Sequence, residues 1–151
     1  MPAIDKDIPA LVCLEQICFQ NDTLIYKDFE KLLVKKNIEV YCVTGEGILI
    51  GSIILSLKKK KNWVRIYNFC VHPVVRGQGV GTAMLMAIEK YAQFKKFDYT
   101  YLEVAASNYN ARTFYESRGY IRFGMYPNYY ETGDSAVRMK KQLSPSKIIV
   151  N

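Results

Sequence analysis

A strand, a loop with alternating glycines and a long amphipathic helix follow one another in residues 63–91, and this succession constrains the fold more than any other feature. Residues 63–72 are β-rich, and Pro73 ends the run because proline cannot donate a hydrogen bond to the ladder. Residues 80–91 carry apolar side chains at helical spacing, and residues 99–104 indicate another strand. A strand that follows another through a helix returns parallel beside it by a right-handed crossover. We therefore predict a mixed sheet with a central parallel pair.

The rest of the chain adds antiparallel strands and three more helices. Two short amphipathic helices are expected in residues 8–19 and 29–33, and β-rich runs at 40–43 and 48–57 form an antiparallel meander with 63–72. A helix over 111–118, capped by Ser107 or Asn108 and ended by Gly119, precedes an antiparallel pair of strands near 120–126 and 136–140. The expected class is α/β with a mixed α+β sheet.

The length of 151 residues suits one compact domain, which we assign to residues 1–143 with a C-terminal tail at 144–151. A chain of this size can bury enough surface to fold without disulfides or a structural metal. The cysteines Cys13, Cys18, Cys42 and Cys70 lie in apolar runs without a C-x-x-C pair, and His72 is the single histidine. We therefore expect core cysteines and no metal site.

The N-terminal residues include acids where a signal peptide has bases, and no apolar run approaches the roughly 20 residues of a membrane span. We expect a cytoplasmic protein with reduced thiols and no membrane partner, either a monomer or a homodimer. The net charge of +7 includes four lysines at positions 58–61. This run is either a solvated hairpin tip or a patch that attracts a ribosome or a nucleic acid, and we favour the tip over the nucleic acid.

The segment between the β-rich run and the long helix can hold an anion. Glycines at 77, 79 and 81 let backbone N–H groups approach a ligand closely, at the positive end of the helix dipole. The segment has neither the Gly-Lys-Ser/Thr of a Walker A loop nor the G-x-G-x-x-G spacing of a dinucleotide fold. A phosphate site and a tight structural turn both fit this pattern.

Two motifs carry a resemblance to a known family. Arg76-Gly77-Gln78-Gly79-Val80-Gly81, after the strand residues 68–71, resembles the acetyl-CoA signature of the GNAT N-acetyltransferases. Residues 102–108, followed by Phe114-Tyr115-Glu116-Ser117, resemble the second cofactor motif of that superfamily. Tyr129-Tyr130 and the segment 134–139 are similar to the RimI-type branch, protein N-terminal acetyltransferases that include enzymes for a ribosomal-protein alanine. The resemblance spans about residues 7–141, with the usual first strand reduced to residues 2–4.

The resemblance implies a GNAT fold, whose parallel pair splays apart, and acetyl-CoA as the acyl donor. Backbone groups of Phe69, Cys70 and Val71 would bind the pantetheine arm and the thioester carbonyl, and Asn108 would hydrogen-bond the pantetheine. The pyrophosphate would lie on the loop residues Arg76, Gly77, Gln78, Gly79, Val80, Gly81 and Thr82.

Glu103 is the candidate general base. Strand alternation places it on the same face as Tyr99 and Tyr101, where a partly desolvated carboxylate suits proton abstraction from an ammonium, directly or through water. The alternative for Glu103 is a structural bond to a nearby lysine or arginine.

Tyr115 is the candidate general acid, because a phenol can protonate a leaving thiolate. Its position matches the tyrosine of the family motif, whereas we expect Phe114 in the core.

The acceptor is expected to be a peptide or protein N-terminus, with a ribosomal protein as one option. By resemblance, Leu24, Tyr26, Tyr129 and Tyr130 flank the acceptor groove. Residues 24–26 are Leu-Ile-Tyr where the RimI-type branch usually has Pro-Trp-Ser, which leaves the accepted residue open. The competing functions are acetylation of a small amine, a lysine or an aminoacyl-tRNA, and a non-catalytic acyl-CoA-binding or ribosome-binding module.

Overall fold

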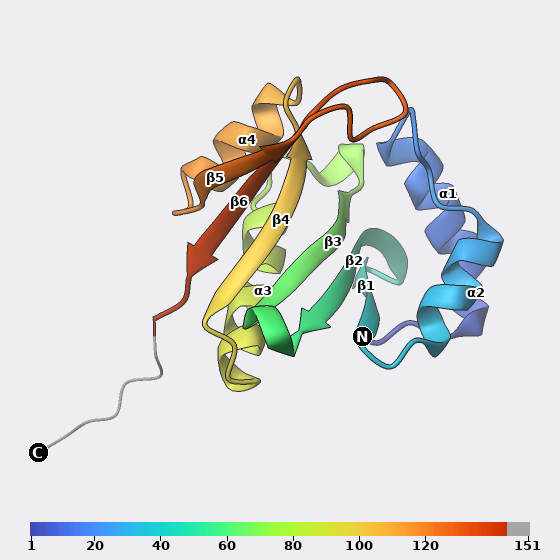
Figure 1. The fold of residues 1–151 in the computed structure, drawn as a ribbon. Helices are drawn as coiled ribbons and strands as arrows, with labels where there is room; N and C mark the ends of the chain where they lie inside the picture. Colours follow the sequence, from blue (N-terminus) through green and yellow to red (C-terminus); the bar gives the residue numbers. More distant parts are fainter. Residues whose placement is uncertain (145–151) are drawn as a thin grey trace, which may run out of the picture. The chain divides into compact units, whose positions relative to one another are not determined.

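The computed structural model describes residues 1–144 (Figure 1). Its elements follow the predicted order: helices α1 (Ile8–Cys18) and α2 (Tyr26–Val34), then strands β1 (Ile38–Gly45), β2 (Ile48–Lys58) and β3 (Trp63–Val71). Helix α3 (Val80–Phe94), strand β4 (Tyr99–Ala105), helix α4 (Tyr109–Glu116) and strands β5 (Ile121–Tyr126) and β6 (Ala136–Gln142) complete the fold. None of the helices in the described part of the chain has the length and apolar character of a membrane span.

The strand order in the sheet is β1-β2-β3-β4-β6-β5, with β3 and β4 parallel. Strand β2 pairs antiparallel with β1, and β6 pairs antiparallel with both β4 and β5. The mixed sheet, its central parallel pair and its four helices confirm the predicted fold class. The sequence pattern did not indicate that β6 lies between β4 and β5.

The chain forms two compact units, of which unit 1 contains residues 1–57 and 66–83. Its core contains apolar residues of α1, α2, β1 and β2, including Ile8, Leu11, Phe29 and Ile54. The first residues of the chain pair with β1: Ala3 N donates to Val40 O at 2.8 Å, and Pro2 forms an isolated antiparallel bridge with Tyr41. This short pairing is where the resemblance expected a reduced first strand.

Unit 2 contains residues 58–65 and 84–144 of the described chain. One face of its strands is covered by α3 and α4, which lie behind β4, β5 and β6 in Figure 1. Lys141 of β6 bonds Glu89 of α3 at 3.0 Å, and the Tyr120 hydroxyl donates to the same carboxylate at 3.0 Å. Buried Leu85, Leu102 and Met139 complete this side of the unit.

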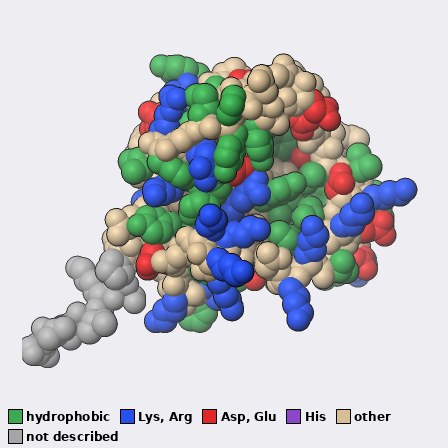
Figure 2. All heavy atoms as spheres, in the orientation of Figure 1, with side chains coloured by type: hydrophobic (Ala, Val, Ile, Leu, Met, Phe, Trp, Pro, Cys, Tyr) green, Lys and Arg blue, Asp and Glu red, His purple; other side chains and the backbone are tan. Residues whose placement is uncertain are grey.

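The opposite face of unit 2 combines aromatic and cationic side chains. The Trp63 and Tyr101 rings stack with centroids 4.2 Å apart, and Phe123 meets Tyr101 edge-on at 5.8 Å. Figure 2 shows Lys and Arg side chains gathered among hydrophobic ones over these strands. We call this surface the cationic face, and it is formed by Trp63, Arg65, Tyr101, Phe123, Arg138 and Lys140.

The lysines at 58–61 are exposed and continue from β2 into a one-turn 3-10 helix before β3, as expected for a solvated hairpin tip.

The expectation for the cysteines was wrong in part. Cys42 and Cys70 are buried, but Cys18 is half-buried and Cys13 is exposed. Cys13 follows Val12 on the side of α1 away from Leu11 and Leu14, because the apolar run there is longer than the buried stripe of the helix.

Candidate active site

The glycine loop of unit 1 joins β3 to α3 and contains two residues in the left-handed region. Gly77 has φ +80° and Gly79 has φ +84°, and a Cβ added at either position would meet no atom within 4 Å. The backbone conformation therefore requires glycine, while the space beside it stays open to a ligand.

The loop is held by its own side chains. His72 Nδ1 accepts from the Val74 amide at 3.1 Å, and Arg76 Nε donates to Val71 O at 3.0 Å. The first helical bond runs from Ala83 N to Gly79 O at 3.0 Å, so the preceding amides lie at the end of α3 where a helix leaves N–H groups without intrahelical acceptors. This arrangement suits an anion such as a pyrophosphate, without a metal. Residues 1–144 contain no cluster of three or more metal-ligating side chains.

The end of β3 is tied to α1 through sulfur and backbone atoms. Cys18 Sγ donates to Val71 O at 3.4 Å. A hydrogen bond from Cys70 and the positive charge of Arg76 lower the pKa of the Cys18 thiol to about 7, while burial opposes them. Conversely, the bond with Cys18 and burial raise the pKa of Cys70. The carbonyl of Val71, predicted to bind pantetheine, thus already has two donors in its own unit.

Glu15 is a buried carboxylate that the sequence reasoning missed. It is 2% exposed, and it accepts from Leu24 N at 3.2 Å, Asn68 Nδ2 at 3.0 Å and Cys70 Sγ at 3.6 Å. Burial raises its pKa, which these hydrogen bonds partly counter. The available signal was an acid within the apolar stripe of α1, directly after Leu14.

Glu103 lies on the cationic face of unit 2 in an ion pair. Arg65 Nη2 donates to Glu103 Oε1 at 2.5 Å, and the side chains of Arg65 and Glu103 are 23% and 8% exposed. The Tyr129 hydroxyl donates to the same oxygen at 3.0 Å and lies 3.3 Å from Arg65 Nη2. The arginine bond foreseen as the alternative for Glu103 is therefore present, and it holds the carboxylate in one orientation.

The loop that carries Tyr129 and Tyr130 is braced at its base. Both amides donate to Asp134 O, at 3.0 and 3.1 Å, and the Asp134 carboxylate accepts from the Ser107 amide and hydroxyl. The Tyr126 and Tyr129 rings stack at 5.7 Å. Burial and the nearby Glu103 charge raise the pKa of Tyr130 to about 12. The backbone bond to Asp134 and the stacking on Tyr126 hold Tyr129 in place as a donor to Glu103.

Helix α4 carries the other two predicted residues of unit 2. Asn108 Oδ1 accepts from Ala111 N at 3.2 Å, so Asn108 is the helix cap. Tyr115 is 8% exposed, with its ring 5.5 Å from that of Tyr120. Phe114 is half-buried under the Arg118 guanidinium, 3.9 Å from the ring centre. The core prediction for Phe114 was wrong, because the inward position of the short helix belongs to Tyr115.

The predicted acceptor residues divide between the units. Leu24 and Tyr26 belong to unit 1, where Tyr26 begins α2 with 47% exposure. Tyr129 and Tyr130 belong to unit 2, as do Glu103, Asn108 and Tyr115, whereas residues 69–82 belong to unit 1.

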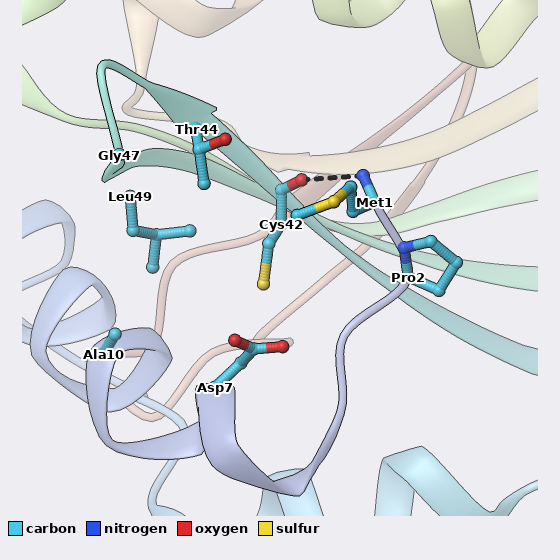
Figure 3. A pocket seen from close by; sticks show the side chains of 8 residues that line it. All are labelled: Met1, Pro2, Asp7, Ala10, Cys42, Thr44, Gly47 and Leu49. Carbon is cyan, nitrogen blue, oxygen red and sulfur yellow. Dashed lines mark hydrogen bonds between the residues drawn. The ribbon is translucent and has the colours of Figure 1, made fainter.

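A pocket of about 180 Å³ in unit 1 is lined by none of the residues predicted to bind donor or acceptor or to act in catalysis (Figure 3). Its edge is formed where the Met1 ammonium donates to Cys42 O at 3.0 Å. The lining residues are Met1, Pro2, Asp7, Ala10, Cys42, Thr44, Gly47 and Leu49.

The acetyltransferase (GNAT) domain family matches residues 13–143, and the chain belongs to this family. It is 34% identical over 110 residues to the uncharacterized N-acetyltransferase MJ1530 of Methanocaldococcus jannaschii, covering 71% of this chain and 68% of that one.

Two solved structures share the fold. The ribosomal-protein-S18-alanine N-acetyltransferase of Escherichia coli superposes with a TM-score of 0.85 at 23% identity, covering 100% of this chain and 97% of that one. Ard1 of Thermoplasma volcanium gives 0.83 at 26% identity, covering 95% and 96%. The protein is an acyltransferase of the GNAT family, whose members use acetyl-CoA.

Proposed function

We propose that this protein acetylates the α-amino group of protein N-termini, with acetyl-CoA as donor. The observation that carries the proposal is the 3.0 Å hydrogen bond from Tyr129 to Glu103. It joins the loop expected to contact the acceptor to the carboxylate expected to take its proton, although the two were predicted from separate motifs. The fold relative from Escherichia coli acts, by its name, on the alanine of a ribosomal protein, which supports a peptide acceptor.

Donor binding rests on the loop of unit 1. The open backbone at Gly77 and Gly79 supports a role for the amides of residues 77–82 in holding a pyrophosphate, with Arg76 and Gln78 beside them. The backbone of Phe69, Cys70 and Val71 would bind the pantetheine, together with Asn108. When bound, acetyl-CoA supplies an activated acetyl group, so that an N–C bond forms as the thioester C–S bond breaks.

The residues of unit 2 move the protons. Glu103 accepts a proton from the acceptor ammonium, directly or through one water, and thereby exposes the nitrogen lone pair. Arg65 and Tyr129 act as positioning residues, because both bind Oε1 of Glu103 and fix its direction. Tyr115 gives its phenolic proton to the departing sulfur, and the second proton lost by the acceptor nitrogen restores the phenol. One proton per turnover therefore leaves the site, from Glu103.

A mass-spectrometric assay tests the proposal. Acetyl-CoA is offered with a library of peptides that differ in their first residues, alongside polyamines, lysine-containing peptides with blocked N-termini and aminoacyl-tRNA. We expect transfer to peptide α-amines. Transfer confined to one of the other pools would refute the proposal, and CoA binding without any transfer would point to a binding module.

Variants assign the roles. Glu103→Gln and Tyr115→Phe should each lower kcat at least tenfold while CoA binding, measured by calorimetry, is retained. Tyr109→Phe is the matched control for Tyr115→Phe, because Tyr109 lies on the same helix with 74% exposure. Unchanged kcat in both site variants would remove Glu103 and Tyr115 from the mechanism.

A further inference from the structure

The cationic face carries charge that its own residues do not neutralise. Arg65 is paired with Glu103, but among residues 1–144 neither Arg138 nor Lys140 has a carboxylate within ion-pair distance. Three cations against one anion leave 3 − 1 = +2 on this surface. Two unneutralised cations on a sheet face favour an anionic ligand.

Arg138 is held in place by its neighbours. Its Nε donates to the Tyr101 hydroxyl at 3.0 Å, and its guanidinium carbon lies 4.7 Å from the Phe123 ring centre and 4.5 Å from that of Tyr126. Phe123 and Tyr126 are 37% and 39% exposed, so the group lies at the surface. A guanidinium fixed through Nε presents its terminal N–H groups as a planar fork, which matches a carboxylate.

The strand register relates these cations to the proposed catalytic centre. Glu103 of β4 is the direct cross-strand partner of Arg138 of β6, and Tyr101 is the partner of Lys140. Lys140 therefore lies two residues, roughly 7 Å, further along β6 than Arg138. An extended peptide advances about 3.3 Å per residue and its alternate side chains point to the same side, so a peptide with its amine at Glu103 can turn its second and fourth side chains, roughly 7 Å apart, toward these two cations.

The ring packing favours a peptide over a single-stranded nucleic acid as the ligand. Nucleic acids bind sheet faces by stacking bases on exposed ring faces. Here Trp63 and Tyr101 stack on each other, Tyr126 stacks on Tyr129, and Arg138 covers Phe123 and Tyr126. The cations remain available to anions, while these rings already pack within the unit.

We propose that Arg138 and Lys140 select acceptors with acidic side chains at the second and fourth positions. The inference rests on the proposed function and names the substrate class of that same site. Arg138 binds one carboxylate through its terminal N–H groups, and Lys140 binds the next as a point charge.

The test compares two acceptor peptides that are identical except at positions 2 and 4, which are Asp and Glu in one and Asn and Gln in the other. We expect kcat/KM to be about tenfold higher for the acidic peptide, as one charge-assisted contact provides. In Arg138→Gln the ratio should fall clearly below about tenfold, because only the Lys140 contact remains. Arg122→Gln is the matched control: it removes the same charge from β5, but its cross-strand partner is Met139, and its ratio should stay about tenfold.

Binding provides a readout separate from transfer. Fluorescence anisotropy of the two labelled peptides, and of a single-stranded RNA of equal charge, is measured on the full chain and both variants. Tighter binding of the acidic peptide that Arg138→Gln weakens supports the inference even if no peptide is acetylated, in which case the proposed function has failed. Equal kcat/KM for both peptides, equal binding, or displacement of the acidic peptide by the RNA overturns the inference, and acetylation of neutral peptides then leaves the proposed function intact.

Discussion

Breaking the Arg65–Glu103 pair should destabilise the protein measurably. Removing one partner of a fully buried pair costs about 3–5 kcal/mol, because the remaining charge stays desolvated. The Arg65 side chain keeps 23% exposure, and Tyr129 still donates to Glu103 after the arginine is lost. We therefore expect Arg65→Gln to lower the free energy of unfolding by about 2 kcal/mol. For a chain of this size the midpoint of thermal unfolding should fall by about 4 to 8 °C.

A double-mutant cycle tests the origin of that loss. Trp63 is the single tryptophan and stacks on Tyr101 beside the pair, so its fluorescence reports unfolding of this region. With Glu103→Gln in the background, Arg65→Gln should cost about 1.5 kcal/mol less than it does alone, because no charge is then left without a partner. Equal costs in both backgrounds would refute the reasoning. Arg122→Gln, an exposed arginine of unit 2, should change stability by less than about 0.5 kcal/mol.

Three further predictions address other features. Gly79→Ala should weaken CoA binding in calorimetry, because strain of about 1–2 kcal/mol at φ +84° destabilises the loop and shifts it. Gly47→Ala, at φ +78° in the β1–β2 turn, should lower the stability by a similar amount and leave the CoA affinity unchanged. Tyr120→Phe should cost about 1–2 kcal/mol in chemical unfolding, because it removes the 2.7 Å partner of the fully buried Thr100 hydroxyl; a smaller loss would contradict this. Burial raises the pKa of Glu15 above 4.5, so the folded state binds more protons and its stability should fall as pH rises through the window above that value. Glu15→Gln should lack this decline, and parallel pH–stability curves would contradict it.

Local pattern was enough to predict the element order and the glycine loop. Helical and strand periodicities are properties of neighbouring residues, and the structure places all ten predicted helices and strands in that order within residues 1–144. Asn108 as a cap and Gly77 and Gly79 at positive φ follow from the same local chemistry. The roles assigned to Glu103, Tyr115 and the loop residues stay predictions, as does the single domain over residues 1–143. Most of the predicted tail lies outside the described residues.

The electrostatic surroundings of the site could not be predicted in this way. Arg65 and Glu103 are 38 positions apart, and their contact depends on which strands are neighbours and on the register. Glu103 and Arg138 face each other because β6 pairs directly with β4 in this register. Glu15 was missed because a helical pattern shows that an acid lies on the apolar stripe but does not show which groups donate hydrogen bonds to it. The core predictions for Cys13 and Phe114 were wrong because an apolar residue type alone does not indicate which side of a short helix is buried.

The division of β3 between the units has a consequence for how the chain is made. Both units are discontinuous, because the chain crosses from one to the other after Leu57, Arg65 and Ala83. During synthesis the last segment of unit 1 emerges at Ala83, while residues 58–65 must wait for residues 84–144 before unit 2 can close. Unit 1 can therefore complete its contacts first, while the strand residues Trp63 to Arg65 still lack their partners in unit 2. A cut after Ala83 therefore keeps unit 1 whole but divides unit 2, because residues 58–65 remain with the N-terminal fragment.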